Sequence, residues 1–450
     1  MSSRLPDDRM LKARRRRPDA VASLQRGDLL PRIVSPPPGP RARQLAEQLA
    51  TFEAPGVNTV GSGPSPLWRE ARGANVLDVD GNRYVDLTSG FGVALVGHRH
   101  PAVVAAVRRQ AARLLHGFGD VHAHPARVAL AAALVARAPM EDAAVYFAAS
   151  GSDAVEVALK TAVLASGRPG VLAFAGGYHG LTLGALAAGG REAFRFPFAA
   201  HLHTHVEHLP FGAPASALAA RLARGTIGSV IVEPVQGRAG VVLPPPGWLA
   251  ELASLARRHG ALLIVDEILT GGGRTGSFFA STAENVEPDL LCCGKALAGG
   301  LPFAAVLGRR ELLDHWPADG EALHTATFLA HPLACSAALA TLRVLDHPDF
   351  QARAVELAAA FATSLEELAA LPIVRAVRGR GLLWGIELRD DAVRSGGATA
   401  WSRRALGAGV LTLPAGERGE VLELLPPAVL TQRQLAVAIA GLRRTAPAQR

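Results

Sequence analysis

Cysteine is scarce in this chain of 450 residues, which contains three, and two of them, Cys292 and Cys293, are adjacent. So few cysteines exclude a fold held together by disulfide bonds and favour a reducing compartment, so the cytoplasm is predicted. The sequence also lacks an apolar run of about 18 residues, so no membrane-spanning helix is predicted. No apolar segment of a signal peptide follows the initial methionine. We interpret Cys292 and Cys293 as buried strand residues.

Lysine is equally scarce, because the 47 basic residues include only Lys12, Lys160 and Lys295. A lysine in an unusual setting therefore indicates chemistry that arginine cannot perform. Lys12 lies in a basic tail, and Lys160 lies on a helical pattern where a solvated side chain is expected. Lys295 stands between apolar residues and two glycines in LLCCGKALAGG (290–300). An amine with a lowered pKa could act there as a nucleophile, and a lysine that reaches solvent from a strand end is the alternative.

Positive charge is concentrated at the N-terminus. Of the formal net charge of +8, residues 1–45 carry +7, from eleven Arg or Lys and four Asp. The remainder has no basic stripe interleaved with aromatic residues, which argues against nucleic-acid binding. We interpret residues 1–40, with the run SPPPGP, as a basic, proline-rich, disordered leader without a partner. A nucleic-acid-binding protein that uses this leader is the alternative from another functional class.

Short apolar segments alternate with amphipathic helical patterns through the middle of the chain. This alternation predicts an α/β fold with a buried, mostly parallel sheet and helices on both faces. An alternating segment around Asp80-Gly81 predicts a hairpin. The expected strands are 144–149, 170–174, 229–234, 261–267, 290–293 and 303–308, and the expected helices are 41–54, 100–115, 126–138, 153–165, 214–224 and 247–260.

The pattern changes near residue 331, where an α+β region begins. We expect a long helix at 333–346, two strand-like pieces at 381–388 and 420–426, and a closing helix. The predicted division of the chain is a leader (1–40), an N-terminal segment that contributes to a small domain (41–100), a large domain (101–330) and a C-terminal small domain (331–450).

Functional groups stand at several of the predicted strand ends, where ligands of open α/β sheets bind. FAASGSDAVEVALK (147–160) runs from a strand through Gly151 and Ser152 into a helix, whose N-terminus favours an anion such as phosphate. An ordinary helix cap is the alternative. In ALLIVDEILTGGGRTG, Asp266 and Glu267 end a strand, and adjacent strand side chains point to opposite faces.

Two further motifs follow the same arrangement. SVIVEPVQG places Glu233 at a strand end, and FAGGYHG presents Tyr178 and His179 on a glycine-rich turn. An aromatic ring on such a turn could stack on a planar ligand, although core packing is the alternative. With Lys295, these are the groups that pyridoxal 5′-phosphate (PLP) requires: a phosphate cradle, a stacking ring, a carboxylate and a lysine.

The motifs occur in the order, and near the spacing, of the class III aminotransferases, which the sequence resembles over about residues 40–440. They are SGSDAVEVALK, GGYHG, IVEPVQG, VDEILTGGGRTG, CCGKALAGGLP and TFLAHPLACSAALA. The resemblance implies the PLP-dependent transferase fold type I, with a mostly parallel seven-stranded sheet in a large PLP-binding domain and a smaller α+β domain. It also implies a homodimer.

The resemblance assigns a role to individual residues. Lys295 would bind PLP covalently and then move a proton between substrate and cofactor, and Asp266 would keep the pyridine nitrogen protonated. The active sites would be shared between two subunits, because one phosphate contact comes from the neighbouring subunit. The remaining cofactor contacts are Tyr178, His179 and Ile268 near the ring, Gly151 and Ser152 at the phosphate, and Thr327 from the neighbouring subunit.

The sequence departs from the family where the substrate is expected. Leu269 replaces a common glutamine, His331 a frequent asparagine and Arg238 a usual acidic residue. In VLELLPPAVL, Glu423 occupies a position where many members have an arginine that binds the α-carboxylate of an amino acid. A carboxylate would repel that group.

Either another arginine, Arg238 or Arg380, binds the carboxylate, or the substrate is cationic, as an aminosugar, an aminoglycoside or a diamine would be. A third alternative is that the local register differs and Glu423 faces away. The predicted substrate contacts are Glu233, Glu423, Phe91 and Arg238.

The sequence therefore predicts a PLP-dependent aminotransferase that transfers an amino group between a primary amine or amino acid and a 2-oxo acid or another carbonyl acceptor. A racemase, epimerase or aminomutase is the alternative, because the same Lys295 could return the proton. His201, His203 and His205 alternate in an extended stretch but lack further ligands, so no metal site is predicted. No nucleic-acid or membrane partner is predicted.

Overall fold

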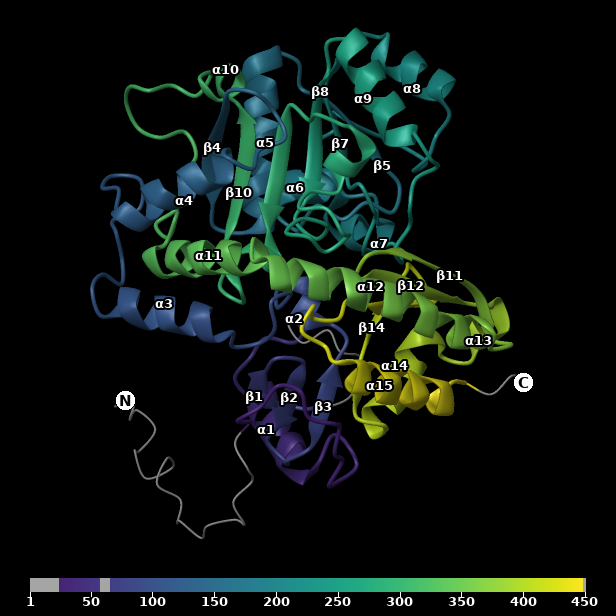
Figure 1. The fold of residues 1–450 in the computed structure, drawn as a ribbon. Helices are drawn as coiled ribbons and strands as arrows, with labels where there is room; N and C mark the ends of the chain where they lie inside the picture. Colours follow the sequence, from purple (N-terminus) through teal and green to yellow (C-terminus); the bar gives the residue numbers. More distant parts are fainter. Residues whose placement is uncertain (1–23, 57–64, 448–450) are drawn as a thin grey trace, which may run out of the picture.

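The computed structural model describes residues 24–56 and 65–447, which form three sheets surrounded by helices (Figure 1). The largest sheet has seven strands in the order β4-β10-β9-β8-β7-β5-β6. Only β10 runs against the others, since it is antiparallel to both β4 and β9, so the predicted mostly parallel seven-stranded sheet is confirmed. Its strands are β4 (Ala143–Ala148), β5 (Gly170–Phe174), β6 (Val206–Leu209), β7 (Ile227–Val232), β8 (Leu262–Glu267), β9 (Leu290–Gly294) and β10 (Ala304–Arg309).

The central strands are mostly apolar because helices cover both faces of the sheet. In β8, Leu263 and Val265 belong to the cluster formed with α8 (Ala215–Leu222) and α9 (Trp248–Arg258), whereas Ile264 belongs to the cluster formed with α5 (Gly151–Ser166). Alternate residues of one strand are thus buried on opposite sides. Ser229 within β7 is a buried exception, whereas the acidic side chains of Asp266 and Glu267 stand at the end of β8.

Two four-stranded sheets lie at the other end of the molecule. The predicted hairpin is confirmed, because β2 (Asn75–Asp78) pairs antiparallel with β3 (Arg83–Asp86). The first sheet has the order β1-β2-β3-β13 and the second β11-β12-β15-β14. Their other strands are β1 (Trp68–Arg72), β11 (Val374–Arg380), β12 (Leu383–Leu388), β13 (Val410–Leu411), β14 (Leu413–Ala415) and β15 (Val421–Leu424).

Two long helices connect these parts. Figure 1 shows α11 (Pro332–Leu345) below the large sheet, between it and α3 (Pro101–Ala111), and α12 (Pro348–Ala369) continuing toward β11 and β12. The sequence analysis missed α12. The remaining helices are α1 (Pro40–Ala50), α2 (Ser89–Gly92), α4 (Pro125–Val135), α6 (Leu183–Ala188), α7 (Glu192–Arg195), α10 (Arg310–Leu313), α13 (Asp390–Arg394), α14 (Gly397–Gly407), α15 (Gln432–Thr445) and the short 3₁₀ helices η1 (Phe196–His201), η2 (Ser281–Glu284) and η3 (Lys295–Ala298).

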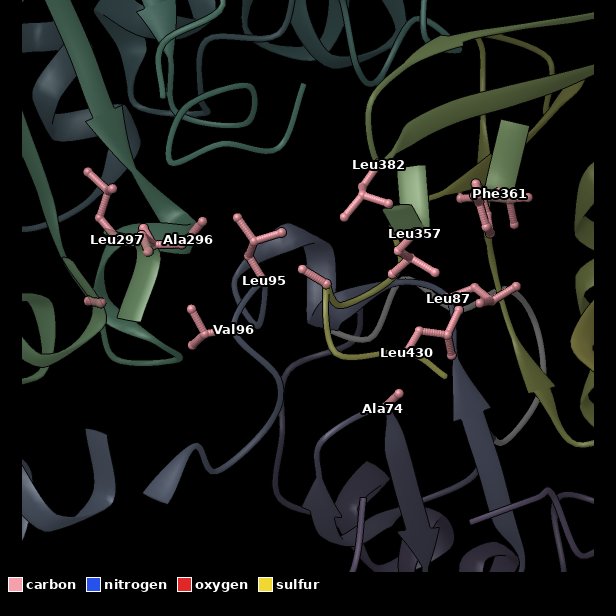
Figure 2. Packing of buried hydrophobic residues seen from close by; sticks show 14 of the residues in the cluster. Ala74, Leu87, Leu95, Val96, Ala296, Leu297, Leu357, Phe361, Leu382 and Leu430 are labelled. Atoms are coloured by element: carbon pink, nitrogen blue, oxygen red, sulfur yellow. The ribbon is translucent and has the colours of Figure 1, made fainter. Parts of the chain in front are cut away.

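One hydrophobic cluster joins the large sheet to the two smaller ones. Figure 2 shows Leu95 and Val96 between Leu297 of η3 and Leu357 of α12, with Leu382 beside them. All of these side chains are buried. The end of the large sheet that carries Lys295 is therefore packed against the C-terminal part of the chain.

The predicted leader requires a correction. Residues 1–23 lie outside the described residues, but residues 24–39 are ordered against the first sheet. Leu24 is buried, and Asn82 accepts hydrogen bonds from the backbone N–H groups of Val34 and Ser35 at 2.8 and 3.0 Å. Side-chain amides of the hairpin thus hold a segment whose composition alone indicated disorder.

Two further findings concern sites that the sequence raised. Within residues 24–56 and 65–447, no group of three or more His, Cys, Asp or Glu side chains is placed to hold a metal ion. Among the described helices, none combines the length and apolar character needed to span a bilayer.

Candidate active site at the ends of the parallel strands

Lys295 follows directly after β9 and is the first residue of η3. Its backbone is left-handed, with φ +37°, which is a strained conformation for a residue with a side chain. The side chain is partly buried, and burial lowers the pKa of its amine. A larger share of this lysine is therefore uncharged near neutral pH than for a solvated lysine, which suits a nucleophile or a proton acceptor.

Asp266 lies at the end of β8, the strand next to β9. Its Oδ2 accepts a hydrogen bond from His179 Nδ1 at 2.8 Å, and its Oδ1 accepts one from the N–H of Ile268 at 3.1 Å. His179 is buried, which lowers its pKa, but the hydrogen bond and charge of Asp266 outweigh burial and raise it overall. The hydrogen bond to His179 holds the carboxylate of Asp266 in position at the same sheet edge as Lys295.

Glu267, the next residue, points to the other face, as the alternation predicts. Its carboxylate accepts hydrogen bonds from the hydroxyls of Thr270 and Ser281 and from the N–H groups of Ala280 and Ser281, at 2.7 to 2.8 Å. Glu267 therefore stabilises the turn after β8, and Asp266 is the carboxylate available at the strand end.

The first turn of α5 lies nearby. Ser150 caps the helix by accepting the N–H of Asp153 at 3.2 Å. The hydroxyl of Ser152 lies 2.7 Å from that of Thr182, and because Thr182 donates its hydrogen to Glu156, Ser152 must donate to Thr182. The hydroxyl hydrogen of Ser152 is therefore already used, and Ser152 can donate only its backbone N–H to an anion. The N–H groups of Gly151 and Ser152 form no hydrogen bond within the described residues.

Small residues let Ile268 approach this turn. A methyl group added to Gly151 would lie 3.1 Å from Cγ2 of Ile268, and one added to Gly294 would lie 3.1 Å from its Cδ1. Ile268 thus packs between the start of α5 and the end of β9. Tyr178 belongs to the turn after β5, and burial raises the pKa of its phenol.

Glu233 and Glu423 approach the same glycine, Gly237. Glu233 accepts the N–H of Tyr178 at 2.9 Å and that of Gly237 at 3.3 Å. A methyl group on Gly237 would lie 3.6 Å from Glu423 Oε1. Burial raises the pKa of each carboxyl group to about 7. Two carboxyl groups that are each partly protonated near neutral pH are thus gathered beside the lysine.

Glu423 is the less satisfied of the two. It is 2% exposed, its Oε1 has no hydrogen-bond partner in the described part of the chain, and its Oε2 lies 3.8 Å from Arg238. Burial dominates its pKa, while the charges of Arg238 and Lys295 partly offset it. Glu423 thus lies near Arg238 and Gly237, and its contact with a substrate stays a prediction.

The other predicted residues are placed less centrally. Arg380 pairs with Glu284 at 2.9 Å. Phe91 is exposed in a left-handed turn, with φ +62°, beside Gly92, where an added methyl group would lie 3.9 Å from Lys295 Cδ. Thr327 is exposed in the single chain.

Sequence reasoning missed Arg274, which is fully buried within the motif GGGRTG. Its guanidinium donates to the carbonyl groups of Leu382, Pro426 and Gly92 at 3.3, 2.6 and 3.3 Å. Burial lowers its pKa to about 9. The only signal for it was its place between glycines after Asp266.

A family model described as Aminotransferase class-III matches residues 60–445. The chain belongs to the class III aminotransferases. It is 40% identical over 374 residues to the acetylornithine aminotransferase of Methanopyrus kandleri, which covers 82% of this chain and 91% of that protein. The crystal structure of the ornithine aminotransferase from Toxoplasma gondii is 28% identical, with a TM-score of 0.81 over 89% of this chain and 94% of that one. A PLP-bound amine transaminase from an uncultivated Pseudomonas species is 29% identical, with a TM-score of 0.79 over 88% and 98%.

This aminotransferase is a PLP-dependent enzyme that acts on small-molecule amines and oxo acids. The residues at its strand ends fit that cofactor. A lysine with a lowered pKa and a buried carboxylate stand at the ends of neighbouring strands. The N–H groups at the start of α5 that lack a partner among the described residues suit a phosphate, and Gly151 and Gly294 let the side chain of Ile268 pack against this turn and the end of β9.

Proposed function

We propose that this class III aminotransferase takes its amino group from a primary amine that carries a second cationic or hydroxylated group, such as a diamine or an aminosugar. The observation that supports this substrate class is Glu423, a buried carboxyl group with a free oxygen that approaches Gly237 together with Glu233. A carboxylate at this position attracts an ammonium or accepts hydrogen bonds from hydroxyl groups, and it repels the α-carboxylate of an amino acid.

The chain's own residues supply binding and proton transfer. When bound, PLP supplies an electron-accepting ring that stabilises negative charge on the carbon bearing the substrate amine. Lys295 binds the cofactor. Its uncharged Nζ then accepts a proton from that carbon and donates it to the cofactor. Asp266, oriented by His179, holds the proton on the ring nitrogen. Ile268 and Tyr178 fix the plane of the ring.

The phosphate of PLP is proposed to bind the N–H groups of Gly151 and Ser152 and the hydroxyl of Thr327 from a second subunit. The exposure of Thr327 in the single chain supports this arrangement, as do the exposed Phe328 and Phe118 close to it. Exposed apolar side chains of this size mark a contact surface. The enzyme is thus proposed to act as a homodimer with shared active sites.

A half-reaction assay tests the substrate class. The PLP-loaded enzyme is mixed with a diamine, a monoamine of equal length, an aminosugar and glutamate, and loss of the cofactor absorbance is followed. We expect the diamine to react more efficiently than the matched monoamine by about ten- to a hundredfold, the range of one charge-assisted hydrogen bond. Glu423→Gln should remove this preference, and Glu423→Arg should favour glutamate.

Exposed Glu356 on α12 provides the matched control, since Glu356→Gln removes one carboxylate elsewhere. The proposed substrate class is wrong if Glu423→Gln leaves the ratio of diamine to monoamine efficiency at the wild-type value.

A further inference from the structure

His324 joins the loop between α10 and α11 to α5. Its Nε2 lies 2.9 Å from Asp153 Oδ1, and its Nδ1 lies 3.0 Å from Lys160 Nζ. An ammonium can only donate, so Nδ1 is the acceptor and Nε2 carries the hydrogen that it donates to Asp153. The backbone carbonyl of His324 also accepts the hydroxyl of Tyr146 at 2.5 Å. The histidine is thus fixed in tautomer and position by three groups.

Asp153, the hydrogen-bond acceptor of His324, lies next to the proposed phosphate site. Asp153 is in the first turn of α5, directly after the two N–H groups proposed to bind a phosphate. The carboxylate of Asp153 accepts hydrogen bonds from the N–H of Ala149, at 2.8 Å, and from His324. These two bonds fix the orientation of the carboxylate.

The loop beyond His324 is held from the other side as well. His124 Nε2 donates to the carbonyl oxygen of Ala330 at 2.8 Å. Gly119, with φ +56°, passes so close that an added methyl group would lie 3.1 Å from the carbonyl oxygen of Thr327. The backbone of residues 324–330 is therefore fixed at both ends, while the side chain of Thr327 stays exposed.

We propose that His324 is a positioning residue: by tying segment 324–330 to the first turn of α5, it sets Thr327 in place to bind the PLP phosphate in the neighbouring subunit's active site. This inference rests on the proposed shared active site. The first turn of α5 would then have two roles. It binds the phosphate in its own subunit, and through His324 it positions the Thr327 that contacts the phosphate in the other subunit.

Cofactor affinity of the single variants tests the proposal. PLP is titrated into the cofactor-free dimer and followed by absorbance. We expect His324→Ala and Thr327→Ala each to raise the dissociation constant about tenfold, and the double variant to raise it no further than either one, because they remove the same contact. His324→Gln, which can still donate to Asp153, should recover part of the affinity. His315→Ala replaces an exposed histidine of the same loop and should leave the affinity unchanged.

Hybrid dimers locate the effect. Each hybrid has Lys295→Ala in one subunit, so borohydride reduction attaches PLP only to the other subunit. In the first hybrid, His324→Ala is in the subunit that keeps Lys295, and in the second it is in the subunit that lacks Lys295. We expect weakened PLP attachment only in the second hybrid, whose working site receives its Thr327 from the substituted subunit.

Each of the other results contradicts the inference and shows which part of it is wrong. Weakening only in the first hybrid, or additive effects in the double variant, would mean that His324 acts within its own subunit. Normal affinity in His324→Ala alongside weak affinity in Thr327→Ala would exclude His324 but keep the shared site. If Thr327→Ala binds PLP normally, the shared phosphate contact itself is wrong.

Discussion

Among single residues, Glu423 lies at the proposed substrate site, and its burial makes the stability of the folded protein depend on pH. Its carboxyl group is buried, Oε1 has no hydrogen-bond partner among the residues that the structure describes, and burial raises its pKa from the ordinary 4.5 to about 7. A folded-state pKa above the unfolded one means that the folded protein binds the proton more tightly. The stability that this group contributes is complete below pH 4.5 and is lost as the pH rises through 7.

Replacing Glu423 with glutamine should therefore flatten the dependence of stability on pH. A pKa raised from 4.5 to about 7 corresponds to about 3 kcal/mol, so wild type should lose about this much more unfolding free energy than Glu423→Gln between pH 4.5 and 8. Chemical denaturation of both cofactor-free proteins across this range measures the difference. Equal slopes would show that Glu423 is solvated in solution, and the exposed substitution Glu356→Gln should leave the slope of wild type unchanged.

Functional residues differ in how readily they can be identified from the sequence alone. Lys295 could be found because lysine is scarce and its neighbours are apolar, and Glu423 because it breaks a family pattern. His324 and Arg274 could not be found in this way. Histidine and arginine are common here, and the importance of these two residues arises from carbonyl and carboxylate partners that lie far away in sequence.

At the level of elements, the turn between β5 and α6 is held to α5 by one close approach. Gly180 has φ +123°, and a methyl group added to it would lie 2.2 Å from Ser152 Oγ. Ser152 in turn accepts the N–H groups of Leu181 and Thr182, at 3.1 and 3.0 Å. Only glycine allows this contact, which places His179 beside Asp266.

Gly180→Ala should separate the turn from α5. We expect a loss of about 2–4 kcal/mol in unfolding free energy, from backbone strain and steric overlap together, and at least tenfold weaker PLP binding. Gly225→Ala is the control, since Gly225 has φ +72° but no atom within 4 Å of an added methyl group. It should cost about 1 kcal/mol and leave PLP binding unchanged. Urea unfolding and PLP titration measure both, and equal effects of the two substitutions would contradict the argument.

The elements that could be predicted are those with a strong local pattern. The six expected strands of the large sheet are present because each is apolar and bounded by turns. The missed ones have no such pattern. β6 is an edge strand with histidine and glutamate, β11 contains three arginines, and β13 consists of two residues that pair with β3 from more than 300 positions away in the sequence. Tertiary pairing, not local preference, forms these strands.

For the whole molecule, the notable surface feature is a group of exposed apolar side chains near Thr327. Phe118 is 59% exposed. It belongs to the connection between α3 and α4, which runs along the side of the molecule away from β11 and β12 (Figure 1). Gly119 contacts the backbone of Thr327, and the ring of His116 lies 5.6 Å from that of Phe328, so these exposed residues form one surface. Leu115, Val121 and Phe328 are exposed on it as well.

Placing a charge on this surface should separate the subunits and weaken cofactor binding at the same time. A second copy of the chain would bury Phe118, and an unpaired carboxylate in an apolar interface costs several kcal/mol. We therefore expect Phe118→Asp to shift the protein from dimer to monomer in sedimentation at micromolar concentration and to raise the PLP dissociation constant at least as much as Thr327→Ala. Phe52→Asp, at a site 88% exposed near the end of α1, should change neither. A Phe118→Asp protein that remains dimeric would place the subunit interface on another face and remove the support for Thr327 as a shared contact.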